Sequence, residues 1–162
     1  MKNSKAIWTV KTECGPIREK NEDAIYPDKS GSSSLPIKAG IFDGMGGHKK
    51  GEVASLIASE VMNDSFIDIA DYVNLANKNI LDYQNVLTQA LGSKEKLKIQ
   101  TKDFQLKSGD VVFLCTDGVY NEIGDEYLKN KLMDGVTAES LISEVLLQNP
   151  KDNISAIIIN VI

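Results

Sequence analysis

The sequence predicts an α+β fold, because strand-like and helix-like patterns both recur along its 162 residues. Strand patterns are short apolar or β-branched runs bounded by Gly, Pro or polar clusters. They cover residues 6–12, 24–26, 35–42, 97–106, 111–115 and 153–162. Helix patterns, with apolar residues three or four positions apart, cover residues 51–66 and 69–81 and follow Asp125 and Thr137. No repeat or long linker divides the chain, so we expect a single domain over residues 1–162.

The strand predictions depend on where each apolar run stops. The first run ends at Gly15-Pro16, and the Ser/Gly-rich residues 29–34 are expected to form a flexible hairpin tip. Residues 111–115 are continuously apolar, which predicts a strand that is buried on both faces. Residues 153–162 are rich in β-branched side chains and predict a strong final strand.

The helix predictions depend on apolar stripes and end signals. In residues 51–66 the apolar positions repeat every four residues, and residues 69–81 continue with a second stripe. Asp125 and Thr137 are residue types that cap helix N-termini, so each is expected to begin a helix. The second of these helices is expected to end near Asn149-Pro150.

Composition excludes several functional classes. The net charge is −5 and the pI is about 4.9, which argues against nucleic-acid binding by bulk electrostatics. No apolar stretch approaches the length of a membrane span, and the N-terminus lacks the apolar region of a signal peptide. Cys14 and Cys115 are expected to be free thiols. We therefore expect a cytoplasmic protein with no membrane or nucleic-acid partner, and a monomer.

Four aspartates stand at the ends of predicted strands. Asp43 and Asp117 each follow a strand and precede a glycine, whereas Asp23 and Asp152 precede strands. If neighbouring strands are antiparallel, the end of one lies beside the start of the next, so all four would gather at one edge. Such a cluster repels itself unless a cation compensates, and carboxylate oxygens favour Mg²⁺ or Mn²⁺. The alternative is that each aspartate is an ordinary turn former or cap.

Arg18 precedes this acidic region by a few residues, close to Glu22 and Asp23. A surface arginine is the simpler interpretation. Beside a site with several cations, its guanidinium would bind a phosphate through two parallel hydrogen bonds. Metal ions together with an arginine indicate phosphoryl hydrolysis, in which two cations activate a water and neutralise developing charge.

The ordered set of these motifs resembles the metal-dependent PP2C (PPM) protein serine/threonine phosphatases, in a bacterial form. The matching segments are residues 18–24, 42–48, 51–55, 88–92, 109–118 and 152–155. The resemblance implies an α-β-β-α sandwich of two antiparallel sheets flanked by helices. It also implies hydrolysis of phosphoserine and phosphothreonine on proteins, as the partner of a serine/threonine kinase in bacterial signalling.

The resemblance further implies a centre of two Mn²⁺ or Mg²⁺ ions between the sheets. Asp43 would bridge both ions and Gly44 would offer its backbone carbonyl. Asp117 and Asp152 would hold one ion, and the pair Glu22 and Asp23 would serve the other side. Arg18 would bind the substrate phosphate. The site residues that the resemblance implies are thus Arg18, Glu22, Asp23, Asp43, Gly44, Asp117 and Asp152.

The middle of the chain departs from the family pattern. A Gly-Thr-Thr strand and a Gly-Asp-Ser-Arg segment, which the family places in mid-chain, do not occur here, and with them goes an aspartate that helps to hold a third metal. Three interpretations follow: an active phosphatase, a pseudophosphatase or regulatory binding module with an incomplete catalytic fold, and a degenerate fragment. The retained acids and Arg18 favour the first, and the shortened middle favours the second.

Overall fold

Strand β6 (Ile154–Val161) forms an interior strand of the larger of two sheets. The structure is a computed structural model that describes residues 4–44, 51–65, 68–81 and 99–162. The larger sheet has the order β3–β1–β6–β5, and all of its neighbouring strands are antiparallel. Its other strands are β1 (Lys5–Glu13), β3 (Gly31–Ser34) and β5 (Val111–Cys115).

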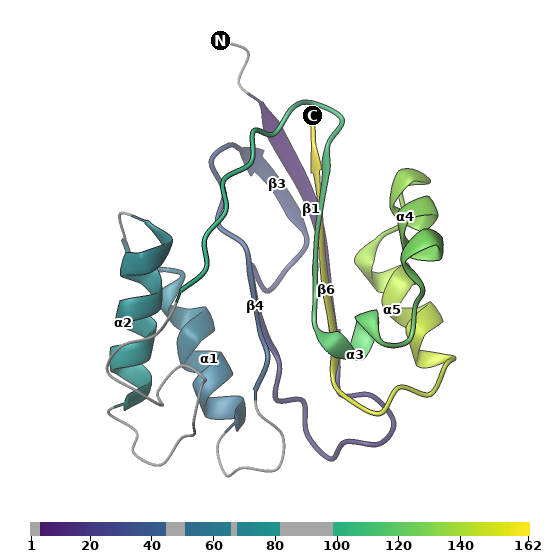
Figure 1. The fold of residues 1–162 in the computed structure, drawn as a ribbon, viewed down its shortest axis with the longest axis horizontal. Helices are drawn as coiled ribbons and strands as arrows, with labels where there is room; N and C mark the ends of the chain where they lie inside the picture. The colour runs from purple at the N-terminus through teal and green to yellow at the C-terminus, as the bar shows by residue number, and fades with distance from the viewer. Residues whose placement is uncertain (1–3, 45–50, 66–67, 82–98) are drawn as a thin grey trace.

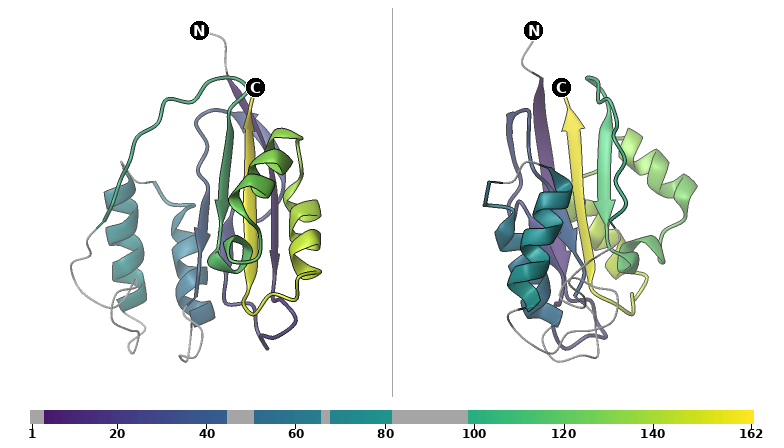
Figure 2. Two further views of the ribbon diagram at one scale, coloured as in Figure 1. Left: turned by 45° about the vertical axis from the view of Figure 1, so that its right-hand side comes forward. Right: turned by 60° about the vertical axis from the view of Figure 1, so that its left-hand side comes forward.

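The remaining elements complete four layers, which Figure 1 shows from one side and Figure 2 from two more. Strands β2 (Ala24–Tyr26) and β4 (Gly40–Phe42) form the smaller antiparallel sheet. Helices α1 (Gly51–Val61) and α2 (Ile69–Leu81) cover its outer side. Helices α3 (Asp117–Tyr120), α4 (Asp125–Met133) and α5 (Ala138–Leu146) lie on the outer side of the larger sheet. The predicted α-β-β-α sandwich is therefore confirmed.

Three apolar cores lie between these layers. On β6, Ile154 and Ile158 pack towards α5, whereas Ile157 and Ile159 face the smaller sheet, because successive side chains of a strand alternate between faces. The third core joins α1 and α2 to the smaller sheet through residues such as Tyr72. Strand β6 is thus buried on both faces and holds the inner layers together.

Several predicted boundaries are wrong for identifiable reasons. The strand expected over residues 35–42 is limited to Gly40–Phe42, and Pro36 lacks the N–H that a ladder needs. The Ser/Gly-rich segment is not merely a hairpin tip, because residues 31–34 pair with β1 as an edge strand. Helix α1 ends at Val61 rather than Phe66, and the Lys38 ammonium donates to the carbonyls of residues 62 and 64 at 3.0 and 2.6 Å.

The chain before and after β5 also differs from expectation. Residues 99–106 of the strand predicted over 97–106 carry no strand, and residues 97–98 lie outside the described part. Strand β5 is at the edge of its sheet, and Val111 is 38% exposed, so the prediction of burial on both faces is wrong. Gly124, not Asp125, is the N-cap of α4, whereas Thr137 caps α5 by accepting a hydrogen bond from the Ser140 amide, as predicted. No helix in the described ranges is long and apolar enough to cross a membrane.

Candidate functional site

Strands β4 and β5 both end at the lower edge of the sheets in Figure 1, and an Asp-Gly pair follows β4 directly and β5 after one residue. Gly44 follows β4 and lies against the backbone of Glu22, where a Cβ would collide with the Glu22 carbonyl oxygen. Gly118 follows β5 and lies in the same way against the carbonyl of Asn153. Only glycine permits such close approaches. The approach at Gly44 brings Asp43 next to the loop of Glu22 and Asp23, and the approach at Gly118 brings Asp117 next to the loop of Asp152.

The four aspartates of the cluster act on one another electrostatically. The pKa of Asp43 is raised to about 6, first by loss of hydration and then by the negative charges of Asp23, Asp117 and Asp152. The positive charge of Arg18 lowers the same pKa. Because charge interactions weaken with distance, these five side chains lie near one another. The predicted gathering of the acids at one edge is therefore what the structure shows.

Hydroxyl groups of the larger sheet hold Asp23 in place. Its Oδ2 accepts hydrogen bonds from the Ser155 hydroxyl at 2.6 Å and the Thr116 hydroxyl at 3.1 Å. Burial raises the pKa of Asp23, and these two hydrogen bonds oppose that rise. The Ser155 hydroxyl also lies 2.7 Å from that of Thr12 on β1. Asp23, which precedes the smaller sheet, is thus anchored to the larger one.

The side chain of Asn153 fixes the loop that carries Arg18 and Glu22. Its amide nitrogen donates to the backbone carbonyls of Cys14 and Lys20 at 2.8 and 2.9 Å. Its amide oxygen accepts from the Glu22 backbone N–H at 2.9 Å. Asn153 is only 5% exposed, so these bonds are shielded from water. One buried amide therefore sets the backbone on both sides of Arg18.

Glu22 lies at the α1 side of the cluster. Burial raises its pKa, and the neighbouring charge of Glu52 adds to the rise. Its Oε2 is a buried side-chain oxygen with no hydrogen-bond partner among the described residues. A buried carboxylate oxygen without a partner is costly unless a cation or a proton satisfies it. Lys20 does not serve this purpose, because its ammonium pairs with Glu52 at 3.1 Å.

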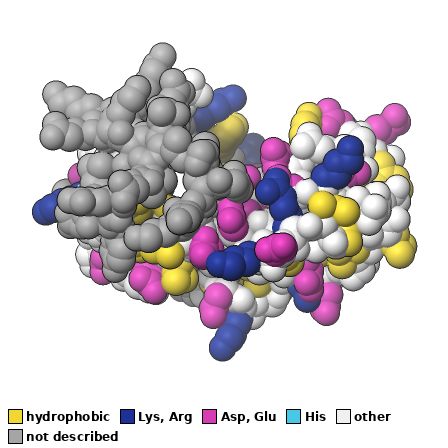
Figure 3. Space-filling view, turned by 90° about the horizontal axis from the view of Figure 1, so that it is seen from below, with side chains coloured by type: hydrophobic (Ala, Val, Ile, Leu, Met, Phe, Trp, Pro, Cys, Tyr) yellow, Lys and Arg dark blue, Asp and Glu magenta, His cyan; other side chains and the backbone are white. Residues whose placement is uncertain are grey.

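Arg18 is the only arginine in the sequence, and it pairs with a member of the cluster. Its Nη2 donates to Oδ2 of Asp152 at 2.8 Å, and its Nε donates to the Lys151 carbonyl at 3.2 Å. Figure 3 views the molecule from this end, where acidic and basic side chains lie side by side near the centre of the face. The guanidinium predicted to bind phosphate therefore contacts a carboxylate predicted to bind metal.

The donor types of the cluster fit magnesium or manganese. The groups are carboxylates and a glycine carbonyl, all hard oxygen ligands, and the unpartnered Glu22 Oε2 is aimed at no other group in the described part. Within the described ranges no three Asp, Glu, His or Cys side chains form a group that could hold a metal as they stand. The chemistry of the site fits two hard cations, and its geometry needs a rearrangement to bind them.

Sequence reasoning assigned no role to the polar residues that position the acids. These residues are Thr12, Asn21, Thr116, Asn153 and Ser155. One signal was available for Ser155, because it is a polar residue inside the most apolar strand of the chain and is fully buried. A hydroxyl in that setting needs a partner.

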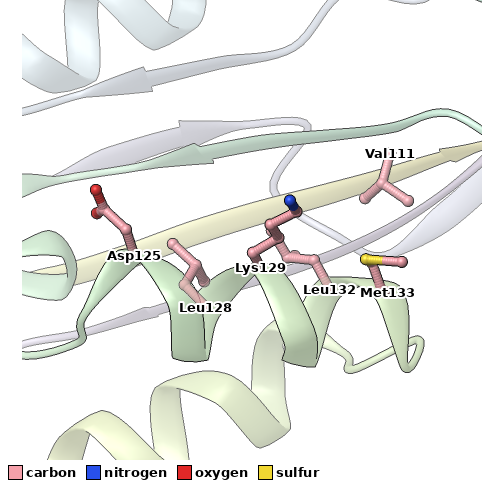
Figure 4. Close-up of a pocket in the computed structure, with 6 residues that line it drawn as sticks. All are labelled: Val111, Asp125, Leu128, Lys129, Leu132 and Met133. Carbon is pink, nitrogen blue, oxygen red and sulfur yellow. The ribbon is translucent and has the colours of Figure 1, made fainter.

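The described pockets lie elsewhere. The pocket between α4 and β5, drawn in Figure 4, has a volume of about 390 Å³ and is lined mainly by Val111, Leu128, Leu132 and Met133. None of the predicted site residues lines it. Residues 45–48 of the motif after Asp43, and residues 88–92 near the shortened middle, lie outside the described part of the chain.

No protein-family profile and no curated protein matches the chain. Among solved structures it is similar to PppA of Pseudomonas aeruginosa, described as a key regulatory component of T6SS, with a TM-score of 0.78, 16% identity and coverage of 99% of this chain and 100% of that one.

Two serine/threonine phosphatases are similar to the same extent. The catalytic domain of PstP in complex with two manganese ions has a TM-score of 0.75 at 18% identity, with 98% of this chain and 99% of that chain covered. Stp1 from Staphylococcus aureus has a TM-score of 0.71 at 17% identity, with 94% of each chain covered. At these identities the likeness establishes the fold. The chain has the fold of bacterial PP2C-type phosphatases, and the predicted resemblance is confirmed at that level.

Proposed function

We propose that this chain is a metal-dependent protein serine/threonine phosphatase that hydrolyses phosphoserine and phosphothreonine. The observation that carries the proposal is the convergence of Asp23, Asp43, Asp117 and Asp152 at one end of a PP2C-type fold, expressed in the raised pKa of Asp43. A self-repelling acid cluster destabilises a protein, and a divalent cation is the compensation that its oxygen chemistry favours.

Each predicted residue has a role in this proposal. Two Mn²⁺ or Mg²⁺ ions would be held by the carboxylates of Glu22, Asp23, Asp43, Asp117 and Asp152 and by the Gly44 carbonyl. When bound, the two ions supply an activated water and neutralise charge on the phosphoryl group. Arg18 would orient the phosphate through paired hydrogen bonds. The substrate would be a protein phosphorylated by a serine/threonine kinase.

Residues outside the acid cluster would keep it organised. The hydroxyls of Ser155 and Thr116 fix the position of Asp23 through its Oδ2. Asn153 fixes the backbone of the loop at Glu22. Because catalysis depends on groups already oriented before the reaction, these contacts support the proposed role of the site.

The deciding assay is hydrolysis of para-nitrophenyl phosphate and of a phosphothreonine peptide with millimolar Mn²⁺. We expect turnover that EDTA abolishes and that Asp43→Asn and Asp117→Asn each lower by about a hundredfold or more, as expected for losing a preorganised electrostatic group. Asp125→Asn, at the exposed start of α4, is the matched control and should retain activity. Well-folded protein without metal-dependent turnover would contradict the phosphatase proposal.

Metal binding can be tested without activity. A ligand that binds only the folded state stabilises it by about 2.7 kcal/mol at a hundred times its dissociation constant. We therefore expect Mn²⁺ to raise the melting temperature of the wild type and to have little effect on Asp43→Asn. An unchanged melting temperature in millimolar Mn²⁺ would contradict the metal site itself.

A second candidate is a regulatory binding module that keeps the acidic edge without turnover. Two observations favour it: the contact of Arg18 with Asp152, and the finding that no three acidic, His or Cys side chains of the described residues form a group that could hold a metal. The two assays separate the candidates. Stabilisation by Mn²⁺ together with an absence of turnover would support the binding module.

A further inference from the structure

The edge of the Arg18 guanidinium that would grip a phosphate is already occupied. Its Nε and Nη2 lie on one side of the planar group, where two parallel N–H bonds can point at one ligand. In the structure they point instead at the Lys151 carbonyl and the Asp152 carboxylate, at 3.2 and 2.8 Å. A phosphate bound to this edge would have to displace the 151–152 segment.

The carboxylate of Asp152 is engaged in the same way. Its Oδ2 accepts from Arg18, and its Oδ1 accepts from the backbone N–H of Asn153 at 2.8 Å. Both carboxylate oxygens of Asp152 therefore already accept a hydrogen bond, and the guanidinium charge lies beside one of them. A cation on Asp152 and the guanidinium 2.8 Å from the same carboxylate repel each other, so the roles proposed for Arg18 and Asp152 oppose each other as long as these two side chains stay paired.

The ion pair of Arg18 and Asp152 is placed so that a divalent cation can replace the guanidinium at the carboxylate. The side chains of Arg18 and Asp152 are 38% and 43% exposed, and solvated ion pairs are weak. A divalent cation carries twice the charge of a guanidinium. It would also be attracted by Asp43, Asp117 and Asp23, because the negative charges of these aspartates and of Asp152 interact with one another. The backbone beside Arg18 is fixed by Asn153, so the exchange requires only that the arginine side chain turns away.

Resting on the proposed function, we propose that Arg18 and the divalent cation compete for Asp152, so that metal binding releases the guanidinium and thereby creates the phosphate site. The metal-binding and phosphate-binding steps are then ordered, with the cation first. Because coupling between two ligands is reciprocal, phosphate that holds Arg18 away from Asp152 strengthens cation binding in turn.

The single arginine makes this exchange directly observable. A ¹H–¹⁵N spectrum of labelled protein contains one arginine Nε–Hε signal, which Arg18→Lys assigns by its loss. The probe is MgCl₂, which is diamagnetic, added to protein freed of metal with EDTA and dialysed. We expect the signal to move from its ion-paired position with the same midpoint as the backbone amides at Asp43 and Asp117. Inorganic phosphate should move it again in the presence of Mg²⁺ and leave it unchanged without Mg²⁺.

Substitutions at Arg18 and Lys20 test the competition by whether they tighten or weaken Mg²⁺ binding. Arg18→Ala frees Asp152, so it should tighten Mg²⁺ binding by about two- to fivefold, the size of an exposed ion pair. Loss of any nearby positive charge strengthens the attraction of the site for cations, so a matched control is needed. Lys20→Ala serves as this control, because the charge of Lys20 lowers the pKa of Glu22 while its ammonium pairs with Glu52 and not with Asp152. It should tighten binding less than Arg18→Ala. Phosphate should then strengthen Mg²⁺ binding to Lys20→Ala as in the wild type, and less in Arg18→Ala.

The outcomes separate the exchange from the proposed function. If the amides at Asp43 and Asp117 respond to Mg²⁺ while the Nε–Hε signal stays unchanged, the metal site stands and the exchange is wrong. Equal or weaker Mg²⁺ binding by Arg18→Ala relative to Lys20→Ala overturns the exchange in the same way. If no signal responds to Mg²⁺, the proposed function fails and the exchange fails with it.

Discussion

The two halves of the sandwich, each a sheet with the helices on its outer side, differ in how many described apolar residues are buried in their cores. Between the larger sheet and helices α3 to α5, ten buried residues form one cluster, among them Leu141, Ile142 and Ile154 at 0% exposure. Between the smaller sheet and helices α1 and α2, the cluster has four buried members among the described residues. In the described ranges the smaller sheet has two strands against four in the larger one. Small sheets depend on packing against other elements for their stability.

The candidate site is assembled from both halves. Asp117 and Asp152 belong to the larger sheet and its connections, whereas Glu22, Asp23 and Asp43 flank the smaller sheet. Among the described residues, the first two are positioned by the larger of these core clusters and the other three by the smaller one. We infer that the precision of the site is limited by the smaller sheet and by the polar contacts that tie it to β6.

The largest effect is expected in the half with the larger core cluster. Leu141 on α5 is fully buried against the larger sheet, so Leu141→Ala removes packing and leaves a cavity. We expect it to lower the free energy of unfolding by about 2–5 kcal/mol. Denaturant unfolding followed by the fluorescence of Trp8, the single tryptophan, measures the change. Leu147→Ala, at a residue that is 84% exposed, is the control and should change stability by about 0.5 kcal/mol or less.

A matching truncation in the other half should open it locally. Met62 is 5% exposed in the core beneath α1 and α2, and Met62→Ala should cost about 2 kcal/mol, the lower end for such changes. Hydrogen exchange should speed up in α1, α2, β2 and β4, while the amides of β6 stay protected. Equal acceleration in β6 would show that both halves unfold as one unit. Leu56→Ala, 53% exposed on α1, is the control.

The contact between the halves is expected to carry a smaller energy. Ser155→Ala removes the 2.6 Å hydrogen bond to Asp23 and the contact with Thr12, both at a fully buried position. We expect a loss of about 1–2 kcal/mol in unfolding free energy, because a hydrogen bond to a charged group disappears. The pKa of Asp23 should rise further, since the lost bond lowers it. Ser143→Ala, which removes an exposed helical hydroxyl contact, should be nearly neutral; an equal loss there would contradict the special role of Ser155.

The contrast between the halves also shows what sequence can predict. Strands β1, β2, β5 and β6 and helices α2 and α5 follow from apolar periodicity and end signals, which are local properties. The gathering of the four aspartates follows from their positions at the ends of antiparallel strands. Both predictions need only the identity of a residue and its place in an element.

Contacts between distant segments could not be predicted. Strand β3 has no apolar pattern, and it becomes a strand because its backbone pairs with β1. Asp152 lies 134 residues from Arg18, and Ser155 lies 132 residues from Asp23. Which of many polar side chains meet depends on the register of the strands and the packing of the sheets, and no local pattern encodes that.

The smallest predicted effect concerns the charge of Asp43 in the protein freed of metal. Its pKa is raised from 3.8 to about 6, so folding favours the protonated form. The folded state then binds more protons than the unfolded chain between these values, and stability falls as the pH rises through this window. Asp43→Asn removes the ionised form, so it should stabilise the protein in EDTA above pH 6, with no gain below pH 3.8.

The gain should reach about 1 kcal/mol at pH 8 rather than the full value of the shift, because Asp43 is only partly shielded from water and solvent screens its charge. Unfolding in denaturant at several pH values, with Asp28→Asn as an exposed control, measures it. A wild type more stable than Asp43→Asn at pH 8 in EDTA would mean that the acids do not repel one another as their placement requires. In Mn²⁺ the order should reverse, because a cation bound by the wild type turns the same repulsion into a contribution to stability.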